Sequence, residues 1–198
     1  MERLILARHG ESDYSARGLV NGDASVRVGL TEAGEEQARA LGRTLAGEPL
    51  DLCITSALER TRATAALALL GRDVPTDAWG ELNDPRAGRF EGLPLSEYRV
   101  WAWAAGSQEE TPGGGESRLE AVSRYGRAYR ALLERPEAAV LAVAHALPIA
   151  YVLAALDGRP PAPRMDRPVA YAHPYPLGAA DLRRALAVIE AWCAAPSW

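Results

Sequence analysis

The chain contains no lysine, and all 22 basic residues among its 198 positions are arginines. It therefore cannot supply a Schiff-base amine or the lysine of a P-loop. Any cation in a binding site must be an arginine or a protonated histidine. Cysteine is also scarce: Cys53 and Cys193 stand alone without metal-ligand spacing. This pattern favours two small buried hydrophobic residues over a metal site or a disulfide framework.

Long hydrophobic runs are missing as well. No apolar stretch approaches the roughly 20 residues of a membrane-spanning helix, and the chain begins directly with a strand-like run. We therefore expect a cytoplasmic protein without a membrane partner. The net charge of −4 disfavours a broad basic surface for nucleic acid. A hydrophobic content of 48% at this length predicts a single globular domain over residues 1–198.

Strand-like and helix-like patterns alternate along the chain. Strands are expected in the run opening at Leu4 and at 50–55, 74–78, 138–144 and 169–173; helices are expected at 30–47, 56–70, 95–105, 116–135, 148–156 and 178–193. Such alternation predicts an α/β fold, a three-layer α/β/α sandwich with a mostly parallel central sheet.

Two helix starts carry recognisable capping signals. Thr31 precedes a first turn rich in glutamate and is a suitable N-cap. The sequence Ser56-Ala57-Leu58-Glu59 has the spacing of a capping box and predicts that the third helix opens at Ser56.

Two segments between these elements have a different character. Residues 13–29 are polar and are expected to form a loop. Residues 79–115 are rich in aromatic side chains and end in three consecutive glycines. We interpret 79–115 as an inserted lid segment over an active site, because long excursions from a compact domain are often functional. Within it, Trp101 and Trp103 are expected mainly to pack the lid.

Basic side chains follow three of the expected strands. Arg8 and His9 end the first, Arg60 lies just beyond the second, and His145 directly follows the fourth. The carboxyl ends of parallel strands meet at one edge of a sheet, where ligands bind. Arginine forks and helix N-termini suit phosphate oxygens. Taken singly, each residue could be a solvated charge or a satisfied structural histidine; together they predict a phosphoryl pocket.

The motifs around these residues resemble those of the histidine phosphatase superfamily, which includes the cofactor-dependent phosphoglycerate mutases. The matches occur in family order over residues 3–152. They comprise Arg8-His9-Gly10-Glu11-Ser12, Asn21-Gly22, Ser56-Ala57-Leu58-Glu59-Arg60, Leu82-Asn83-Asp84, Gly114-Gly115-Glu116-Ser117 and Val143-Ala144-His145. Three positions depart from the common pattern: Asp84 replaces glutamate, Ala146 replaces glycine and Ala57 replaces proline.

The resemblance implies a mechanism and assigns roles to particular residues. His9 would attack phosphorus and form a phosphohistidine, while Arg8, Arg60 and His145 hold the phosphoryl oxygens. Asp84 would be the proton donor, with Glu81 and Glu91 as neighbouring alternatives. Ser12 and Asn21 would contribute to substrate binding. No metal and no cofactor is implied.

The function expected on this basis is hydrolysis of small-molecule phosphomonoesters. Two alternatives remain: a phosphoglycerate mutase-like phosphotransferase, and a catalytically weak phosphate-binding regulatory domain. The expected partner is a small phosphorylated substrate, with a homodimer as one possible assembly. His173 lies outside the motifs and is expected to be structural.

Overall fold

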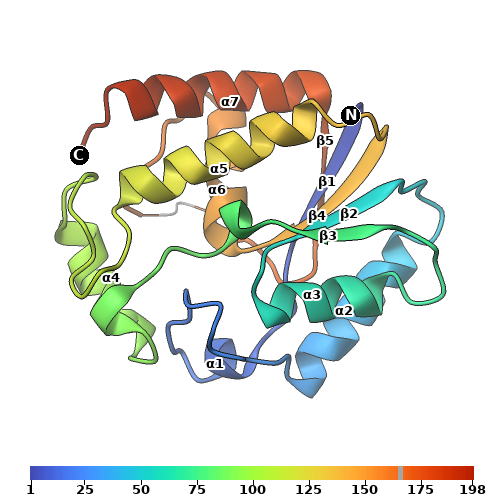
Figure 1. The fold of residues 1–198 in the computed structure, drawn as a ribbon, viewed down its shortest axis with the longest axis horizontal. Coiled ribbons are helices and arrows are strands. Elements are labelled where there is room, and N and C mark those ends of the chain that lie inside the picture. Colours follow the sequence, from blue (N-terminus) through green and yellow to red (C-terminus); the bar gives the residue numbers. More distant parts are fainter. Residues whose placement is uncertain (165–166) are drawn as a thin grey trace.

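The computed structural model describes residues 1–164 and 167–198, and its centre is a five-stranded sheet (Figure 1). The strand order is β3-β2-β4-β1-β5. The first four strands run parallel, and β5 pairs antiparallel with β1 at one edge. The strands are β1 (Arg3–Arg8), β2 (Leu52–Thr55), β3 (Thr76–Ala78), β4 (Ala139–Ala144) and β5 (Pro174–Gly178).

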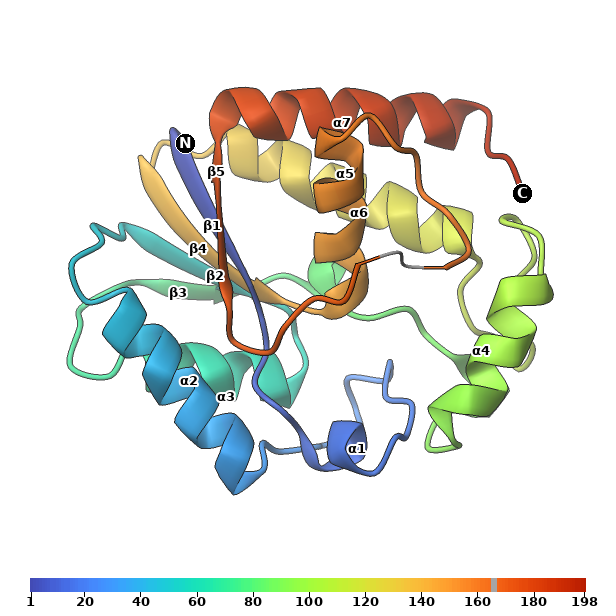
Figure 2. The same cartoon turned by 180° about the vertical axis from the view of Figure 1, so that it is seen from behind.

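Helices cover both faces of the sheet, as Figures 1 and 2 show. On one face lie α2 (Glu32–Thr44) and α3 (Glu59–Ala68); on the other lie α5 (Arg118–Leu133), α6 (Ala146–Leu156) and α7 (Ala179–Ala194). Alternate residues of β1 serve the two faces: Leu4 and Leu6 pack toward α5–α7, and Ile5 and Ala7 toward α2 and α3. The predicted three-layer α/β/α sandwich is confirmed.

The two capping predictions had different outcomes. Thr31 is the N-cap of α2, and its hydroxyl accepts a hydrogen bond from Gly34 N at 3.0 Å. The predicted capping box at Ser56 is wrong, because α3 begins at Glu59 with Leu58 as a cap that lacks a side-chain bond. The Ser56 hydroxyl instead contacts His145. The same hydroxyl accepts from Leu58 N at 3.2 Å, so it supports the turn before α3 without capping the helix.

The predicted strand at 169–173 is also wrong. The fifth strand is Pro174–Gly178, and it is antiparallel. Within it, Pro174 and Pro176 pair with Ala7 and Ile5 of β1. Proline is tolerated in an edge strand, where one side of the backbone makes no ladder bonds. Because proline is rare in strands, the sequence pattern did not predict a strand over these residues.

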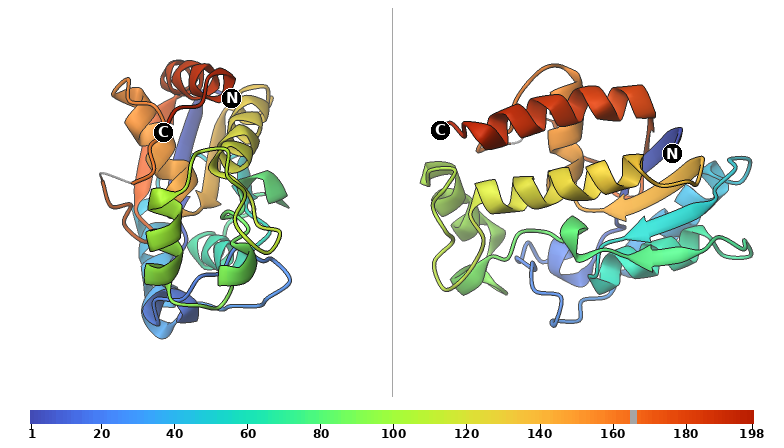
Figure 3. Two further views of the ribbon diagram at one scale, coloured as in Figure 1. Left: turned by 90° about the vertical axis from the view of Figure 1, so that its left-hand side faces the viewer. Right: turned by 45° about the horizontal axis from the view of Figure 1, so that its top comes forward.

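The segments around the carboxyl edge of the sheet are only partly irregular. The expected loop 13–29 begins with a short helix, α1 (Asp13–Ala16), that the sequence analysis missed. Segment 79–115 contains two 3₁₀ turns, η1 (Gly80–Leu82) and η2 (Gly88–Phe90), and the helix α4 (Leu95–Ala104). Figure 3 shows α4 beside the N-terminal end of α5. In the described part of the chain, no helix has the length and hydrophobicity needed to cross a membrane.

Candidate active site

His9 lies immediately beyond β1, where the chain turns sharply over the start of α2. A Cβ atom on Gly10 would lie 2.3 Å from the carbonyl oxygen of Gly34, so only glycine fits this crossing. Gly10 N donates a hydrogen bond to Thr64 Oγ1 at 2.9 Å, which ties the turn to α3. The His9 side chain, only 3% exposed, is therefore held on a rigid backbone.

The hydrogen bonds of the His9 ring define which nitrogen can react. Nδ1 lies 2.6 Å from the carbonyl oxygen of Gly10 and donates its proton there, which leaves Nε2 unprotonated, with a lone pair that accepts a hydrogen bond from Arg60 Nε. Burial lowers the pKa of His9 well below its usual value, and the positive charge of Arg60 and the neighbouring His145 and Arg8 lower it further. The ring is consequently neutral at pH 7, the form in which an imidazole nitrogen can act as a nucleophile.

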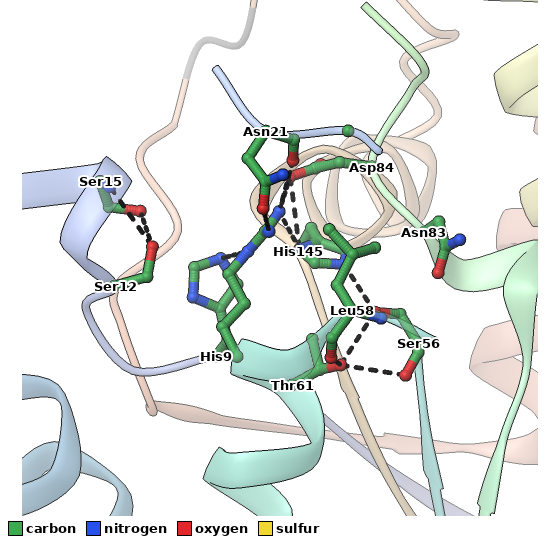
Figure 4. A network of polar contacts seen from close by, with 12 residues as sticks. His9, Ser12, Ser15, Asn21, Ser56, Leu58, Thr61, Asn83, Asp84 and His145 are labelled. Carbon is green, nitrogen blue, oxygen red and sulfur yellow. Dashed lines mark hydrogen bonds and ion pairs between the residues drawn. The ribbon is translucent and has the colours of Figure 1, made fainter. Parts of the chain in front are cut away.

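Arg60 is the centre of the polar network. This side chain is 4% exposed and comes from the first turn of α3. Its Nε is 3.1 Å from His9 Nε2, and its Nη1 donates to Asn21 Oδ1 at 2.5 Å. Its Nη2 lies 2.8 Å from Asp84 Oδ2 and 3.2 Å from His145 Nδ1. Figure 4 shows His9, Asn21, Asp84 and His145 gathered at this point.

A chain of hydroxyl groups fixes the tautomer of His145 (Figure 4). Thr61 Oγ1 donates its single proton to a carbonyl, with Leu58 O at 2.8 Å and Ser56 O at 3.1 Å. The Ser56 hydroxyl therefore donates to Thr61 Oγ1 and accepts from His145 Nε2, both at 2.8 Å. His145 Nδ1 is left facing Arg60. The ring is fully buried, and burial lowers its pKa well below the usual value, with Arg60 adding to the effect.

Of the three candidate acids, Asp84 alone reaches the network. Its Oδ2 pairs with Arg60, and the side chain is 29% exposed. Glu91 instead accepts from two backbone N–H groups, that of Gly22, which is shared between both carboxylate oxygens, and that of Ala87, so its carboxylate ties loops together. Glu81 is exposed on the 3₁₀ turn η1.

The backbone before Asp84 is anchored by its neighbours. Asn83 Oδ1 accepts from Ala57 N at 2.8 Å, which joins this loop to the end of β2. The carbonyl of Asn83 accepts from the hydroxyl of Tyr125 and from Nη1 of Arg124, both at 3.0 Å. The position of the Asp84 carboxyl group is therefore set by α5 as well as by its own loop.

Arg8 is held by a segment that the sequence motifs do not include. Its Nη1 donates to the carbonyl of Val169 at 2.9 Å, and its guanidinium lies 3.8 Å from the ring centroid of Tyr171. Ala172 N donates to Arg8 O, and Ala172 has a φ of +46°, a strained value for a residue with a side chain. Arg8 Nε is buried without a hydrogen-bond partner in the described chain.

The two predicted substrate-binding residues differ in what they do here. Asn21 contributes its side-chain oxygen directly to Arg60. Ser12 is the N-cap of α1, where its hydroxyl bonds with Ser15. Both residues border the same cavity. His173, expected to be structural, is exposed and lies edge-on against Tyr175.

A cavity of about 700 Å³ opens from this network toward solvent. Its inner end is formed by Arg8, His9, Arg60 and Asp84, whereas His145 lies behind Arg60 and does not border it. Its outer end is formed by Tyr98, Arg99, Trp103, Arg118 and Arg164. Trp103 thus borders the cavity, whereas Trp101 packs against Phe90 and Tyr98, as expected of lid packing. In the described residues, no three His, Cys, Asp or Glu side chains are grouped as a metal site.

Comparison with known families decides the classification. The model of the histidine phosphatase superfamily (branch 1) matches residues 4–191. The chain belongs to the histidine phosphatase superfamily. The resemblance inferred from the motifs is confirmed, and the match extends beyond 3–152 to include β5 and most of α7.

Relatives of this chain within the histidine phosphatase superfamily include proteins named as mutases and proteins named as phosphatases. A 2,3-bisphosphoglycerate-dependent phosphoglycerate mutase of Methylobacterium sp. (strain 4-46) is 41% identical over 63% of this chain and 64% of its own length. An adenosylcobalamin/alpha-ribazole phosphatase of Salmonella typhimurium is 39% identical over 58% of each chain. The chain thus spans less than two thirds of these two relatives. The solved alpha-ribazole phosphatase of Shigella flexneri superposes with a TM-score of 0.76 at 30% identity, covering 88% of this chain and 89% of that one.

The sequence did not predict three residues that contact Arg8 or line the cavity of this histidine phosphatase site: Tyr171, Ala172 and Arg118. Tyr171 and Ala172 lie in a proline-rich stretch without a family motif, and nothing in their spacing points to Arg8. Arg118 follows the Gly-Gly-Glu-Ser turn at the start of α5, and only the fold brings it to the cavity.

Proposed function

We propose that this protein is a phosphatase that hydrolyses small-molecule phosphomonoesters through a phosphohistidine on His9. The observation that carries the proposal is the orientation of the His9 ring, with Nδ1 bonded to Gly10 and a neutral Nε2 beside the Arg60 guanidinium. A nucleophile, a cation for the transferring group and a carboxyl group therefore share one end of a cavity.

In the first step, His9 Nε2 attacks phosphorus, so that a P–N bond forms as the P–O bond to the leaving group breaks. Arg8 and Arg60 stabilise the charge on the phosphoryl oxygens. A phosphoryl oxygen that takes the Arg60 Nη2 donor from Asp84 comes within reach of His145 Nδ1. His145 can donate to that oxygen only after Nδ1 takes up a proton, and the negative phosphoryl group favours this protonated form. The Asp84 carboxyl group gives its proton to the leaving oxygen, and the negative phosphoryl group beside it stabilises the protonated form beforehand.

In the second step, water attacks phosphorus and the P–N bond breaks. Asp84 takes a proton from that water, inorganic phosphate leaves and neutral His9 is restored. The partial exposure of Asp84 allows water to reach the carboxylate that activates it. The proposed acceptor of the phosphoryl group is water; transfer to a second substrate is the mutase alternative.

The relatives suggest which substrates to test first. Proteins named adenosylcobalamin/alpha-ribazole phosphatase place an aromatic nucleotide-like phosphomonoester at the head of the panel. The aromatic side chains Tyr98 and Trp103 at the outer end of the cavity suit such a body. Phosphoglycerates test the mutase alternative, and sugar phosphates and nucleotides complete the panel.

Trapping of the covalent intermediate tests the mechanism. Rapid acid-free quenching after mixing with substrate, followed by intact-protein mass spectrometry and peptide mapping, should find a phosphate on the peptide that contains His9. The same species should be absent from His9→Ala. Active turnover with a phosphate mapped elsewhere, or with none, would refute the assignment of His9.

The proposal extends to the setting of the enzyme. We propose a cytoplasmic enzyme that needs neither metal nor cofactor and binds neither nucleic acid nor membrane. Activity should persist in excess EDTA, and a strict requirement for Mg²⁺ or Zn²⁺ would place the protein in another mechanistic class. Size-exclusion chromatography with light scattering tests the proposed homodimer.

A further inference from the structure

Arg118 differs from the other arginines at the outer end of the cavity because it is half-buried and has no acidic partner. Arg99 and Arg164 are exposed, where a charge is solvated at little cost. Arg118 Nη1 donates to the hydroxyl oxygen of Tyr151 at 3.1 Å, and among the described residues no carboxylate lies within ion-pair distance of it. A partly buried charge without a counter-ion is costly, which calls for an explanation.

The contact of Arg118 with Tyr151 holds the side chain in place but neither neutralises its charge nor uses all of its N–H donors. Tyr151, 4% exposed, gives its hydroxyl proton to the carbonyl of Ala162 at 3.3 Å, so its oxygen lone pairs face Arg118. No nitrogen of Arg118 is both fully buried and without a hydrogen-bond partner in the described chain. Each guanidinium nitrogen that lacks a protein partner is therefore still accessible to solvent. The accessible space includes the main cavity, which Arg118 lines.

A contribution to the stability of α5 does not explain why an arginine occupies position 118 either. It is the first residue of a 16-residue helix, and the positive end of a helix dipole disfavours a cation there. Glu120, the acidic residue of this first turn, is engaged with Ser117 in the capping box. A second hollow lined by Arg118 has a volume of about 10 Å³ and has room for at most a water molecule. Of these two hollows in the described structure, the main cavity is the one with room for a larger anion.

From these observations we propose that Arg118 forms a second anion-binding subsite, which selects phosphomonoesters that carry a further acidic group, a carboxylate or a second phosphate. The phosphoryl group occupies the inner end of the cavity, and the second acid binds the Arg118 guanidinium and gains from the α5 N-terminus. The lining of the same cavity also includes Tyr98, Ala102 and Leu147, which suit an apolar body. This inference rests on the proposed phosphatase function and adds its substrate class.

The test uses alkyl phosphates of three to eight carbons, each paired with its ω-carboxyalkyl phosphate and its α,ω-bisphosphate. For the pair whose length spans the two subsites, wild-type kcat/KM should be about 10- to 100-fold higher for the diacid. Arg118→Gln should lower the ratio of the two kcat/KM values toward one, and Arg118→Lys should restore part of it. The control Arg127→Gln removes the same charge from the exposed face of α5 and should keep the wild-type ratio. The carboxylate and bisphosphate arms show which acid is preferred.

Several outcomes would overturn the proposal. A wild-type enzyme with no preference for either diacid at any length excludes the subsite, whether or not Arg118→Gln folds. An equal loss on plain and acidic substrates in Arg118→Gln would show that Arg118 only joins α5 to α6. Calorimetry with the corresponding phosphonates measures the same preference without turnover. Arg118-dependent binding of acidic phosphonates by a protein that hydrolyses nothing would refute the proposed function and support the subsite.

Discussion

The two ends of the cavity are built in opposite ways. At the inner end, Arg60 is 4% exposed and its three nitrogens all have protein partners. At the outer end, Trp103 is 41% exposed, and Arg164 lies over its ring 4.6 Å from the centroid. The inner end is pre-organised on strand ends and one helix start, whereas the outer end combines α4 with the start of α5. We infer that the inner end determines the reaction and the outer end the substrate.

The largest effect should follow from removal of the proposed nucleophile, His9. His9→Ala should lower kcat by about 10⁴-fold or more, because the P–N bond of the proposed covalent intermediate forms on His9 Nε2. Steady-state kinetics on an alkyl phosphate measures the loss, and circular dichroism checks that the fold survives. Residual activity above a tenth of wild type would exclude the phosphohistidine route.

The next effect should depend on the leaving group. Asp84→Asn should cost about 10²–10⁴-fold in kcat on an alkyl phosphate, whose alkoxide needs a proton as it leaves. The cost should be much smaller on p-nitrophenyl phosphate, whose phenolate leaves unaided. The variants Glu81→Gln and Glu91→Gln are matched controls, and the structure gives each carboxylate a place outside the network.

The contrast between the two substrates, rather than the loss alone, is decisive for Asp84. A contrast in either glutamate variant and none in Asp84→Asn would move the proton donor to that glutamate. Glu91→Gln should instead lower stability, because its carboxylate accepts hydrogen bonds from two backbone N–H groups, those of Gly22 and Ala87.

A smaller effect is expected for oxyanion binding. Vanadate mimics a transferring phosphoryl group, and Arg60→Ala should weaken its inhibition by about 10- to 150-fold through loss of charged hydrogen bonds. The inhibition constant measures this change, and the exposed Arg127→Ala is the control. An unchanged vanadate affinity in Arg60→Ala would remove this arginine from the pocket.

The buried histidines predict how stability depends on pH. The folded-state pKa values of His9 and His145 are both lowered, so below about pH 6.5 the unfolded chain binds more protons than the folded one. Stability is therefore present above the unfolded pKa and falls with decreasing pH, by about 1.4 kcal/mol per pH unit for each histidine. Urea unfolding between pH 7 and 5 measures the slope.

Variants separate the two histidines in that measurement. His9→Asn and His145→Gln should each reduce the slope, whereas His173→Gln at an exposed position should leave it as in wild type. A slope that survives both buried substitutions would assign the acid sensitivity to other groups.

The two ends of the cavity also differed in how far the sequence predicted them. Arg8, His9, Arg60 and His145 follow strands whose parallel arrangement brings them to one edge, so hydrophobic patterning was sufficient to place them. The role of Ser56 was misjudged because a capping pattern is local, and the side chain is used by His145 across the fold. A local sequence pattern does not contain information about a hydrogen bond to a residue that is distant in the chain.

The outer end depends on contacts that have no sequence signature. Arg118 reaches the cavity only because α5 starts beside α4, and Tyr151 holds it from the second turn of α6. Likewise, β5 was hidden by its prolines, and its true position determines where residues 169–172 run. Those residues hold Arg8, so an error in one edge strand concealed part of the site.

The smallest effect on vanadate binding is expected at Arg8, the inner-end arginine that is held by the irregular segment 169–172. The ring of Tyr171 lies 3.8 Å from the Arg8 guanidinium, and such a contact is worth about 0.5–2 kcal/mol. Tyr171→Leu removes it and should weaken vanadate binding by about 2- to 30-fold. Tyr171→Phe retains the ring, and the hydroxyl forms no hydrogen bond with Arg8, so it should bind vanadate within about twofold of wild type. Equal losses in both variants would show that the hydroxyl, and not the ring over Arg8, is the group that matters. Equal retention in both would show that the Val169 carbonyl, which accepts from Arg8 Nη1 at 2.9 Å, suffices to hold the arginine against the phosphoryl group.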